Sequence, residues 1–339
     1  MTTKRLVPIL AGACLLLAGW YLLMPHVGTN AEPPVKKGGG FAADRADDRL
    51  PDPAPFDGDR AMRYLRTLCE IGPRISGSAG MQRQQELLEA HFKKHGAQVT
   101  WQRFTATQPS QARSVAMANL IASWHPERPR RVVLCTHYDT RPKADQEPDP
   151  RRWDEPFVSA NDGTAGVAWL MELAHHVEKL STEVGIDFVL FDGEEWVFDG
   201  PVPAAPGRDR YFLGSEHFAA EYRKSATKPR IIAAVLLDLA AGKDAKFPIE
   251  QNSGMLAGPL VSEIWGIARK LGVNRFQPQW GPNVLDDHLA LNRVGIPAVD
   301  IIDFSYPHWH RLSDRPEQCS SETMSDVARV LTVWLQRVR

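Results

Sequence analysis

The chain has 339 residues, of which 43% are hydrophobic and 24% are charged, and this composition is typical of a folded globular protein and excludes long disorder. Its 40 lysines and arginines are balanced by 41 aspartates and glutamates, so it lacks the basic excess of a nucleic-acid-binding protein. The cysteines form no Cys-x-x-Cys pair, which argues against a disulfide scaffold and against a cysteine-rich zinc module. They are Cys14, Cys69, Cys135 and Cys319.

The N-terminus carries a membrane segment. Two basic residues precede an almost uninterrupted apolar stretch at residues 6–24, long enough to cross a bilayer. An uncleaved anchor is favoured by this length and by the Trp20-Tyr21 pair near its far end, whereas a signal peptide would be cleaved near Ala31. Residues 1–25 therefore predict either a membrane-anchored protein whose remainder lies outside the cytoplasm, in the periplasm, a lumen or the exterior, or a secreted one.

Residues 26–55 predict a flexible linker. They are rich in proline, glycine, alanine and aspartate and have almost no large apolar side chains, so they cannot bury enough surface to order themselves. Residues 56–339 contain no internal repeat and no second long Pro/Gly-rich break. We expect them to form one catalytic domain.

The remaining elements alternate between two periodicities. Helical spacing of apolar residues predicts helices at 57–70, 82–95, 163–180, 211–224, 259–271 and 322–338. Short apolar runs rich in β-branched residues predict buried strands at 131–135, 186–191, 231–237 and 296–302. Strands that alternate with helices predict an α/β fold with a mostly parallel sheet covered on both faces.

Histidines or carboxylates follow all four predicted strands. The carboxyl ends of parallel strands share one edge of an open α/β sheet, where ligands bind, so these side chains are expected to converge. A further carboxylate, Asp162, stands at the start of a predicted helix. The groups after the strands are His137, the Glu194-Glu195 pair, Asp238 and the His308-Trp309-His310 segment.

A cluster of histidines and carboxylates without cysteine is typical of a catalytic zinc, which takes three protein ligands and leaves a position open. Of the paired Glu194-Glu195, one carboxylate can bind the metal while the other acts as general acid or base. Taken singly, each residue has a plainer interpretation: Asp162 as a helix N-cap, the glutamate pair as a solvated surface, His137 as a satisfied polar group. Their shared position after buried strands favours the metal site.

Several motifs together resemble the zinc aminopeptidase and glutaminyl cyclase superfamily, and most closely its glutaminyl-peptide cyclotransferase branch. In order they are CTHYDT, SANDGTAGVAWLMELA, FDGEEW, LLDLAAG, and DDHLALNRVGIPAV followed by WHRLSD. The resemblance covers residues 57–339. It implies a single α/β/α sandwich around a mixed, mostly parallel sheet, a zinc cofactor, and the N-termini of peptides or proteins as substrates.

The resemblance also implies roles for individual residues. Glu194 matches the catalytic acid or base, and Asp238 and His137 match positions that bind a second zinc in the aminopeptidases. In the cyclases the counterpart of Asp238 acts by hydrogen bonding. His308 competes with His310 as a ligand, but the Trp-His order favours His310. The implied zinc ligands are Asp162, Glu195 and His310.

Trp309 and Asp286 resemble cyclase residues, the first a wall of the substrate pocket and the second a catalytic carboxylate. Their plainer interpretations are a core aromatic and a helix N-terminal carboxylate. Two positions depart from the cyclase pattern: a pocket tryptophan is replaced near residues 199–201, where Trp196 is a candidate substitute, and a pocket histidine is replaced by Asp300. Substrate recognition therefore stays open.

Three functions follow from these residues. A cyclase would convert an N-terminal glutamine to pyroglutamate and release ammonia, with Glu194, Asp238 and Asp286 moving the proton. An aminopeptidase would use Glu194 to activate water, with a second zinc on His137 and Asp238. A non-catalytic ectodomain would be expected to have lost ligands, yet every matching position is filled.

Overall fold

The computed structural model describes residues 49–199, 207–225 and 229–339. The expected membrane segment at residues 6–24 lies outside these ranges, as does most of the expected linker. Within the described ranges, no helix combines the length and the apolar character needed to cross a membrane.

The centre of the fold is a mixed six-stranded sheet in the order β1-β2-β4-β3-β5-β8. Strands β4, β3, β5 and β8 run parallel to one another, whereas β1 and β2 form an antiparallel pair added at the β4 edge. The bounds are β1 Gln98–Ala106, β2 Val115–Trp124, β3 Arg130–His137, β4 Gly185–Phe191, β5 Arg230–Asp238 and β8 Ala298–Ile302. A separate pair, β6 Phe247–Ile249 and β7 Phe276–Trp280, forms a small second sheet.

The four strands predicted from apolar runs are confirmed as β3, β4, β5 and β8, and the antiparallel pair was missed. β2 contains three alanines and an asparagine, residues of low strand propensity. β1 has exposed residues on both faces (Gln98 and Thr100 on one, Arg103 and Thr105 on the other), so it shows no alternating apolar pattern.

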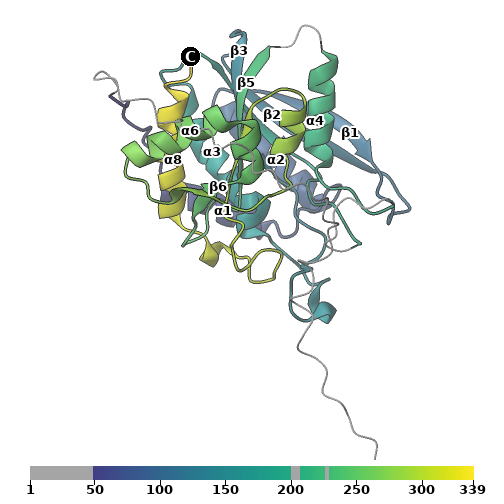
Figure 1. Ribbon diagram of the computed structural model, residues 1–339. Coiled ribbons are helices and arrows are strands. Elements are labelled where there is room, and N and C mark those ends of the chain that lie inside the picture. The colour runs from purple at the N-terminus through teal and green to yellow at the C-terminus, as the bar shows by residue number, and fades with distance from the viewer. Residues whose placement is uncertain (1–48, 200–206, 226–228) are drawn as a thin grey trace, which may run out of the picture. The chain divides into compact units, whose positions relative to one another are not determined.

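Helices cover both faces of the sheet (Figure 1). One face packs against α1, α2, α3, α6 and α8, and the other against α4 and α7. The six predicted helices are all present. The bounds are α1 Gly58–Glu70, α2 Ala79–Lys94, α3 Ala165–Val177, α4 Leu213–Lys224, α5 Gln251–Leu256, α6 Gly258–Lys270, α7 His288–Arg293 and α8 Ser321–Leu335.

The central strands are buried on both faces. Along β3, Val132 and Leu134 join the core under α1 to α3, whereas Val133 and Cys135 join the core under α4 and α7. This alternation follows from the two-residue period of a strand. It explains why the sequence shows continuous apolar runs. The cysteines of the described ranges, Cys69, Cys135 and Cys319, are buried and free.

The chain enters and leaves this domain at neighbouring points. The compact unit begins at Leu50, and its first residues lie on α8: the Ala54 N–H donates to Thr332 Oγ1 at 3.1 Å, and Gln336 Nε2 donates to the Asp52 carbonyl at 3.0 Å. Arg130, the first residue of β3, donates to the carbonyl of Arg339. Both ends therefore lie at the amino-terminal edge of the parallel strands.

Candidate active site

The polar side chains predicted to converge lie together at the carboxyl edge of the parallel strands. β3 ends at His137, β5 ends at Asp238, and Glu194 follows β4 after a short turn. Asp162 lies in the irregular segment before α3, and His310 in the loop after β8. At least 24 residues of sequence lie between any two of these groups, yet the sheet places them at one edge.

Asp162, Glu195 and His310 form a buried cluster. His310 Nε2 lies 3.2 Å from a Glu195 oxygen and 3.6 Å from Asp162 Oδ2, and one ligand atom from each residue fits within a 4.8 Å group. Asp162 Oδ2 and Glu195 Oε2 are buried without a hydrogen-bond partner. Burial, followed by the charge of Asp162, raises the pKa of Glu195 to about 7. A cation between these groups would bind the unpartnered oxygens and offset the repulsion between the two carboxylates. The cluster therefore fits a metal ion.

Two further residues orient this cluster. His310 Nδ1 lies 2.9 Å from Asp145 Oδ1, which leaves Nε2 facing Glu195 and Asp162. Arg141 donates from Nη2 to Asp145 at 2.6 Å and from its backbone N–H to Glu195 Oε1 at 2.7 Å. Carboxylates that hold the outer nitrogen of a histidine ligand are typical of metal sites. Neither residue belongs to a sequence pattern that predicts a site.

His137, Asp162 and Asp238 form a second cluster that shares Asp162 with the first. His137 Nε2 lies 3.1 Å from Asp162 Oδ1 and 3.4 Å from Asp238 Oδ1. Gly163 makes this approach possible, because its φ is +72° and a Cβ there would lie 2.6 Å from the His137 ring. The arrangement is therefore that of two adjoining cation positions bridged by one aspartate.

Asp139 shapes the turn that carries the glutamate pair. Its two carboxylate oxygens accept from the backbone N–H groups of Glu194 at 3.1 Å and Glu195 at 3.3 Å. The paired glutamates consequently point to different partners: Glu195 faces the first cluster, and a Glu194 oxygen lies 3.8 Å from His137 Nδ1.

Glu194 and Asp286 are carboxylates of the cavity lining with strongly raised pKa values. The Glu194 side chain is 13% exposed and lines the pocket together with Asp286 and Asp238. Burial raises the pKa of Glu194 well above its usual value, and burial and Asp238 do the same for Asp286. Asp300 is fully buried and lies outside the pocket lining, and burial and the charge of Asp286 raise its pKa. Asp300 therefore interacts with Asp286, which lines the pocket, but does not line it itself.

The loop that carries Asp286 is held by Glu250. The Glu250 carboxylate accepts from the backbone N–H groups of Val284 at 3.0 Å, Asn252 at 2.9 Å and Ser253 at 2.6 Å. Burial opposes its ionisation, but hydrogen bonds from His288 and these N–H groups lower the pKa of Glu250 to about 2. It therefore stays charged and fixes the loop. This residue, too, had no signal in the sequence.

A cavity of about 310 Å³ opens over the first cluster. The Trp309 ring stacks on His310 with centroids 3.9 Å apart, and Phe304 lies 5.1 Å from Trp309. Tyr211 and Phe212 line the cavity from the segment before α4. The cavity is therefore lined both by carboxylates and by aromatic rings.

Two alternatives from the sequence are decided by position. Trp196 is 3% exposed, packs with Met117 and Leu213 and does not line the cavity, so it is no substitute for a pocket tryptophan. His308 Nδ1 lies 2.9 Å from Ser313 Oγ and belongs to neither cluster, so His310 is the ligand candidate of this loop.

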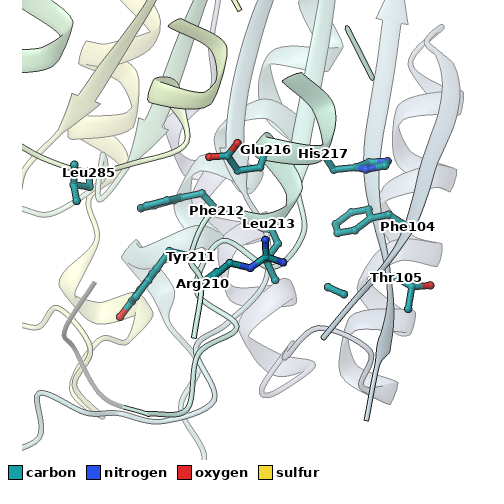
Figure 2. Close-up of a pocket in the computed structure, with 10 residues that line it drawn as sticks. Phe104, Thr105, Arg210, Tyr211, Phe212, Leu213, Glu216, His217 and Leu285 are labelled. Atoms are coloured by element: carbon teal, nitrogen blue, oxygen red, sulfur yellow. The ribbon is translucent and has the colours of Figure 1, made fainter. Parts of the chain in front are cut away.

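A second cavity, of about 620 Å³, adjoins the first and shares Tyr211, Phe212 and Leu285 with it. Figure 2 shows the His217 ring from α4 beside Phe104 from β1, and the two rings stack at 4.6 Å. The catalytic cavity thus continues into a longer groove along α4.

Some of the strained backbone lies at these cavities. Among the described residues other than glycine, His125, Ser159, Phe212, Leu239 and His310 have φ between +47° and +61°, which is costly for such residues, and His125 lies away from the cavities. His310 is a metal-ligand candidate, Phe212 is a pocket wall, and Leu239 follows Asp238. Strain at such positions is typical of functional sites.

Comparison with known proteins agrees with this geometry. Peptidase family M28 matches residues 119–335. The structure of glutaminyl cyclase from Fimbriiglobus ruber is 50% identical, with a TM-score of 0.84 over 87% of this chain and 100% of that one. A Zn-dependent exopeptidase from Parabacteroides distasonis is 29% identical, with a TM-score of 0.77 over 86% and 100% of the two chains. Bovine glutaminyl-peptide cyclotransferase is 26% identical over 65% of this chain, which spans 66% of that enzyme. The chain therefore belongs to peptidase family M28 and, within it, to the glutaminyl cyclases.

Proposed function

We infer that this chain is a zinc-dependent glutaminyl-peptide cyclotransferase that converts the N-terminal glutamine of a peptide to pyroglutamate and releases ammonia. The observation that carries this inference is that Glu194 and Trp309 line the same cavity as the buried cluster of Asp162, Glu195 and His310. The 50% identity to the Fimbriiglobus ruber glutaminyl cyclase over its whole length supports it.

Zinc suits the first cluster. Two carboxylates and one imidazole form a ligand set of the kind that catalytic zinc uses, and their buried unpartnered oxygens need a cation. Asp162, Glu195 and His310 would hold it. When bound, zinc supplies Lewis acidity that polarises the side-chain amide of the substrate glutamine.

Glu194 performs the proton transfer. Its raised pKa suits a group that takes a proton from the substrate α-amine as the amine attacks the amide carbon, and then gives that proton to the departing ammonia. Asp238 and Asp286 line the same wall of the cavity and hold the amine in line for attack. Water is not a reactant, so the aromatic walls that exclude it favour cyclisation over hydrolysis.

The rest of the peptide has room along α4. The cavity of about 310 Å³ suits a single residue, and the adjoining groove of about 620 Å³ begins at the shared Tyr211, Phe212 and Leu285. We assign this groove to the residues that follow the glutamine. Peptides and protein N-termini are therefore the proposed substrates.

The activity is tested with a glutamine-initiated peptide, with and without a zinc chelator, and a no-enzyme control. The expected product has lost one ammonia with its chain intact, and the chelator abolishes its formation. A shortened peptide with free glutamine would refute the proposal.

Glu194→Gln tests the assigned role. We expect turnover to fall by at least ~10²-fold, because the substituted amide cannot transfer the proton, while bound zinc is unchanged. Glu86→Gln, at an exposed position on α2, is the matched control and should keep full activity. Wild-type turnover in the Glu194 variant would show that another group moves the proton.

A metalloaminopeptidase is the second candidate, and the cluster of His137, Asp162 and Asp238 favours it, because this cluster offers the place for a second zinc. A zinc count separates the two. At saturation, one ion in these two clusters together supports the cyclase, whereas two ions with peptide hydrolysis support the aminopeptidase.

We also propose that the enzyme acts outside the cytoplasm, anchored through residues 6–24 or secreted after their cleavage. The support is the apolar character of that stretch. Cell fractionation with sequencing of the mature N-terminus tests it, and a soluble cytosolic enzyme with an intact N-terminus would overturn it.

A further inference from the structure

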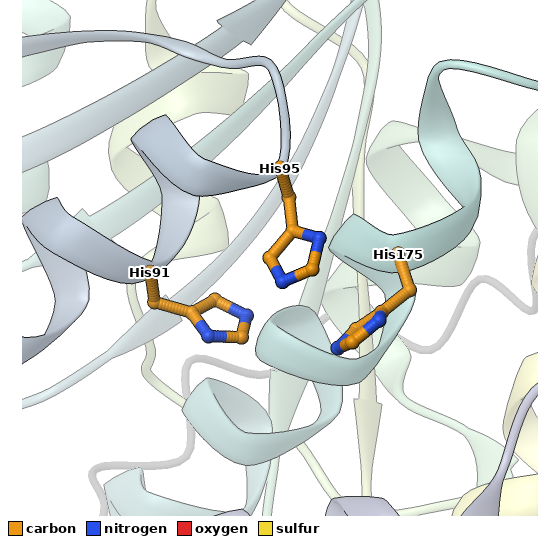
Figure 3. A group of neighbouring side chains, drawn as sticks. All are labelled: His91, His95 and His175. Carbon is orange, nitrogen blue, oxygen red and sulfur yellow. The ribbon is translucent and has the colours of Figure 1, made fainter.

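Three histidines meet far from the catalytic cavity. His91 and His95 stand one turn apart at the end of α2, and His175 faces them from α3 (Figure 3). One ring nitrogen from each lies within a 4.8 Å group, and the His95 and His175 ring centroids are 3.9 Å apart. All three side chains are half-buried. Neither the proposed reaction nor the two catalytic clusters use them.

Hydrogen bonds occupy one ring nitrogen each of His91 and His175 and leave the other nitrogen of each ring available as a ligand. His91 Nε2 lies 2.8 Å from the Met171 carbonyl, which can only accept, so Nε2 carries the proton and Nδ1 keeps its lone pair. His175 Nε2 lies 2.8 Å from the Tyr64 hydroxyl. A backbone carbonyl or hydroxyl at the outer nitrogen is the usual support of a histidine that binds a metal. His95 has no side-chain hydrogen bond within the described residues.

The surrounding charges permit a cation. Arg60 is the basic group nearest the trio from α1, and the buried carboxylate of Glu172 neutralises it through a 2.8 Å hydrogen bond to Nη2. Lys94, on the solvent side, is the other basic neighbour. Burial, aided by mutual repulsion, lowers the pKa of His91 and of His175 to about 4. The rings are therefore neutral at physiological pH, as metal binding requires.

We propose that His91, His95 and His175 form a peripheral site for a divalent transition-metal ion, with Zn²⁺ as the probe. Imidazole is a ligand that zinc prefers, and three of them leave one position for water. The site is separate from the catalytic one, because α3 starts beside Asp162 and the histidine stands near its other end, about 15–20 Å along the helix axis at 1.5 Å per residue. This proposal does not depend on the proposed function.

The experiment counts zinc in the full-length protein. Metal-depleted protein is dialysed against buffered micromolar Zn²⁺, and bound zinc per chain is measured by mass spectrometry for wild type, His95→Ala and His175→Ala. Both variants are expected to bind one ion fewer than wild type, and to cyclise peptide within about twofold of the wild-type rate. His176→Ala is the matched control: this residue is next to His175, but its ring contacts Glu172 at 3.2 Å and is not part of the trio.

The outcomes separate cleanly. Equal zinc in wild type and in both trio variants would overturn the proposal. An equal loss in His176→Ala would overturn it as well, because it would show that damage to α3 and not ligation removes the ion. Thermal unfolding of each variant without zinc checks that the helices survive substitution.

Discussion

Replacing Asp145 with asparagine should weaken zinc binding without removing any ligand. Burial pushes the pKa of Asp145 upward, but the hydrogen bond from His310 and the charge of Arg141 lower it to about 2. A shift of this size from the ordinary 3.8 corresponds to about 2 kcal/mol in favour of the ionised form. Asparagine keeps an acceptor for His310 but loses the charge that faces Arg141 Nη2 at 2.6 Å. The loss of a carboxylate that supports a metal ligand typically costs ~10–100-fold in metal affinity, or about 1.4–2.7 kcal/mol. This range agrees with the free energy obtained from the pKa shift of Asp145.

The assay is competition for zinc against a chromophoric chelator, with unfolding in urea as a check on the fold. We expect the zinc dissociation constant of the Asp145→Asn protein to rise ~10–100-fold, with activity recovered at high zinc. Asp149→Asn is the matched control, because Asp149 is bonded to the exposed Arg151 and does not reach the cluster. A dissociation constant within twofold of wild type would refute the reasoning that Asp145 supports His310 as a ligand.

Three other substitutions test separate parts of the structure. Gly163→Ala should destabilise the fold by about 1–3 kcal/mol in urea unfolding, because its Cβ would meet the His137 ring at a φ of +72°; unchanged stability would mean that the loop relaxes freely. Burial opposes the ionisation of Glu172, but hydrogen bonds from His176 and Arg60 lower its pKa to about 2. Its ionised form should therefore contribute about 2–3 kcal/mol to the free energy of unfolding above pH 4.5, and this contribution is lost as the pH falls toward 2. Glu172→Gln should abolish that loss, and a pH profile parallel to wild type would contradict it. Trp309→Ala should raise KM about tenfold with little change in kcat, since the ring that stacks on His310 walls the cavity; an unaltered KM would remove Trp309 from the binding site.

Much of the fold could be predicted from the sequence because the central strands are buried on both faces of the sheet. A strand such as β4, buried on both faces, needs a continuous apolar run, and the polar residues that follow the run mark the open edge. This pattern predicted His137, Glu194 and Asp238 at that edge. It could not find β1, an edge strand with several exposed polar residues, or β2, whose alanines and asparagine have low strand propensity.

The supporting residues of the site could not be predicted, for a physical reason. Asp145 and Glu250 act through contacts with chain segments 165 and 34 residues away, and nothing in their local sequence distinguishes them from surface carboxylates. Likewise, Trp196 was a plausible pocket residue by proximity in sequence, and only packing shows that it belongs to a neighbouring core. The candidate ligands could be predicted because they come directly after strands. The residues that orient them could be recognised only from tertiary contacts.

The neighbouring entry and exit points of the chain have a practical consequence. Asp52 and Arg339 both lie at the amino-terminal edge of the parallel strands, whereas the catalytic cavity opens at their carboxyl edge, about 25 Å away along the eight residues of β3. A solid support or a fusion partner that is attached through Arg339 therefore lies at the end of the domain opposite the cavity. Immobilised enzyme coupled in this way should keep its cavity open to substrates as large as folded proteins, with no spacer needed to clear it.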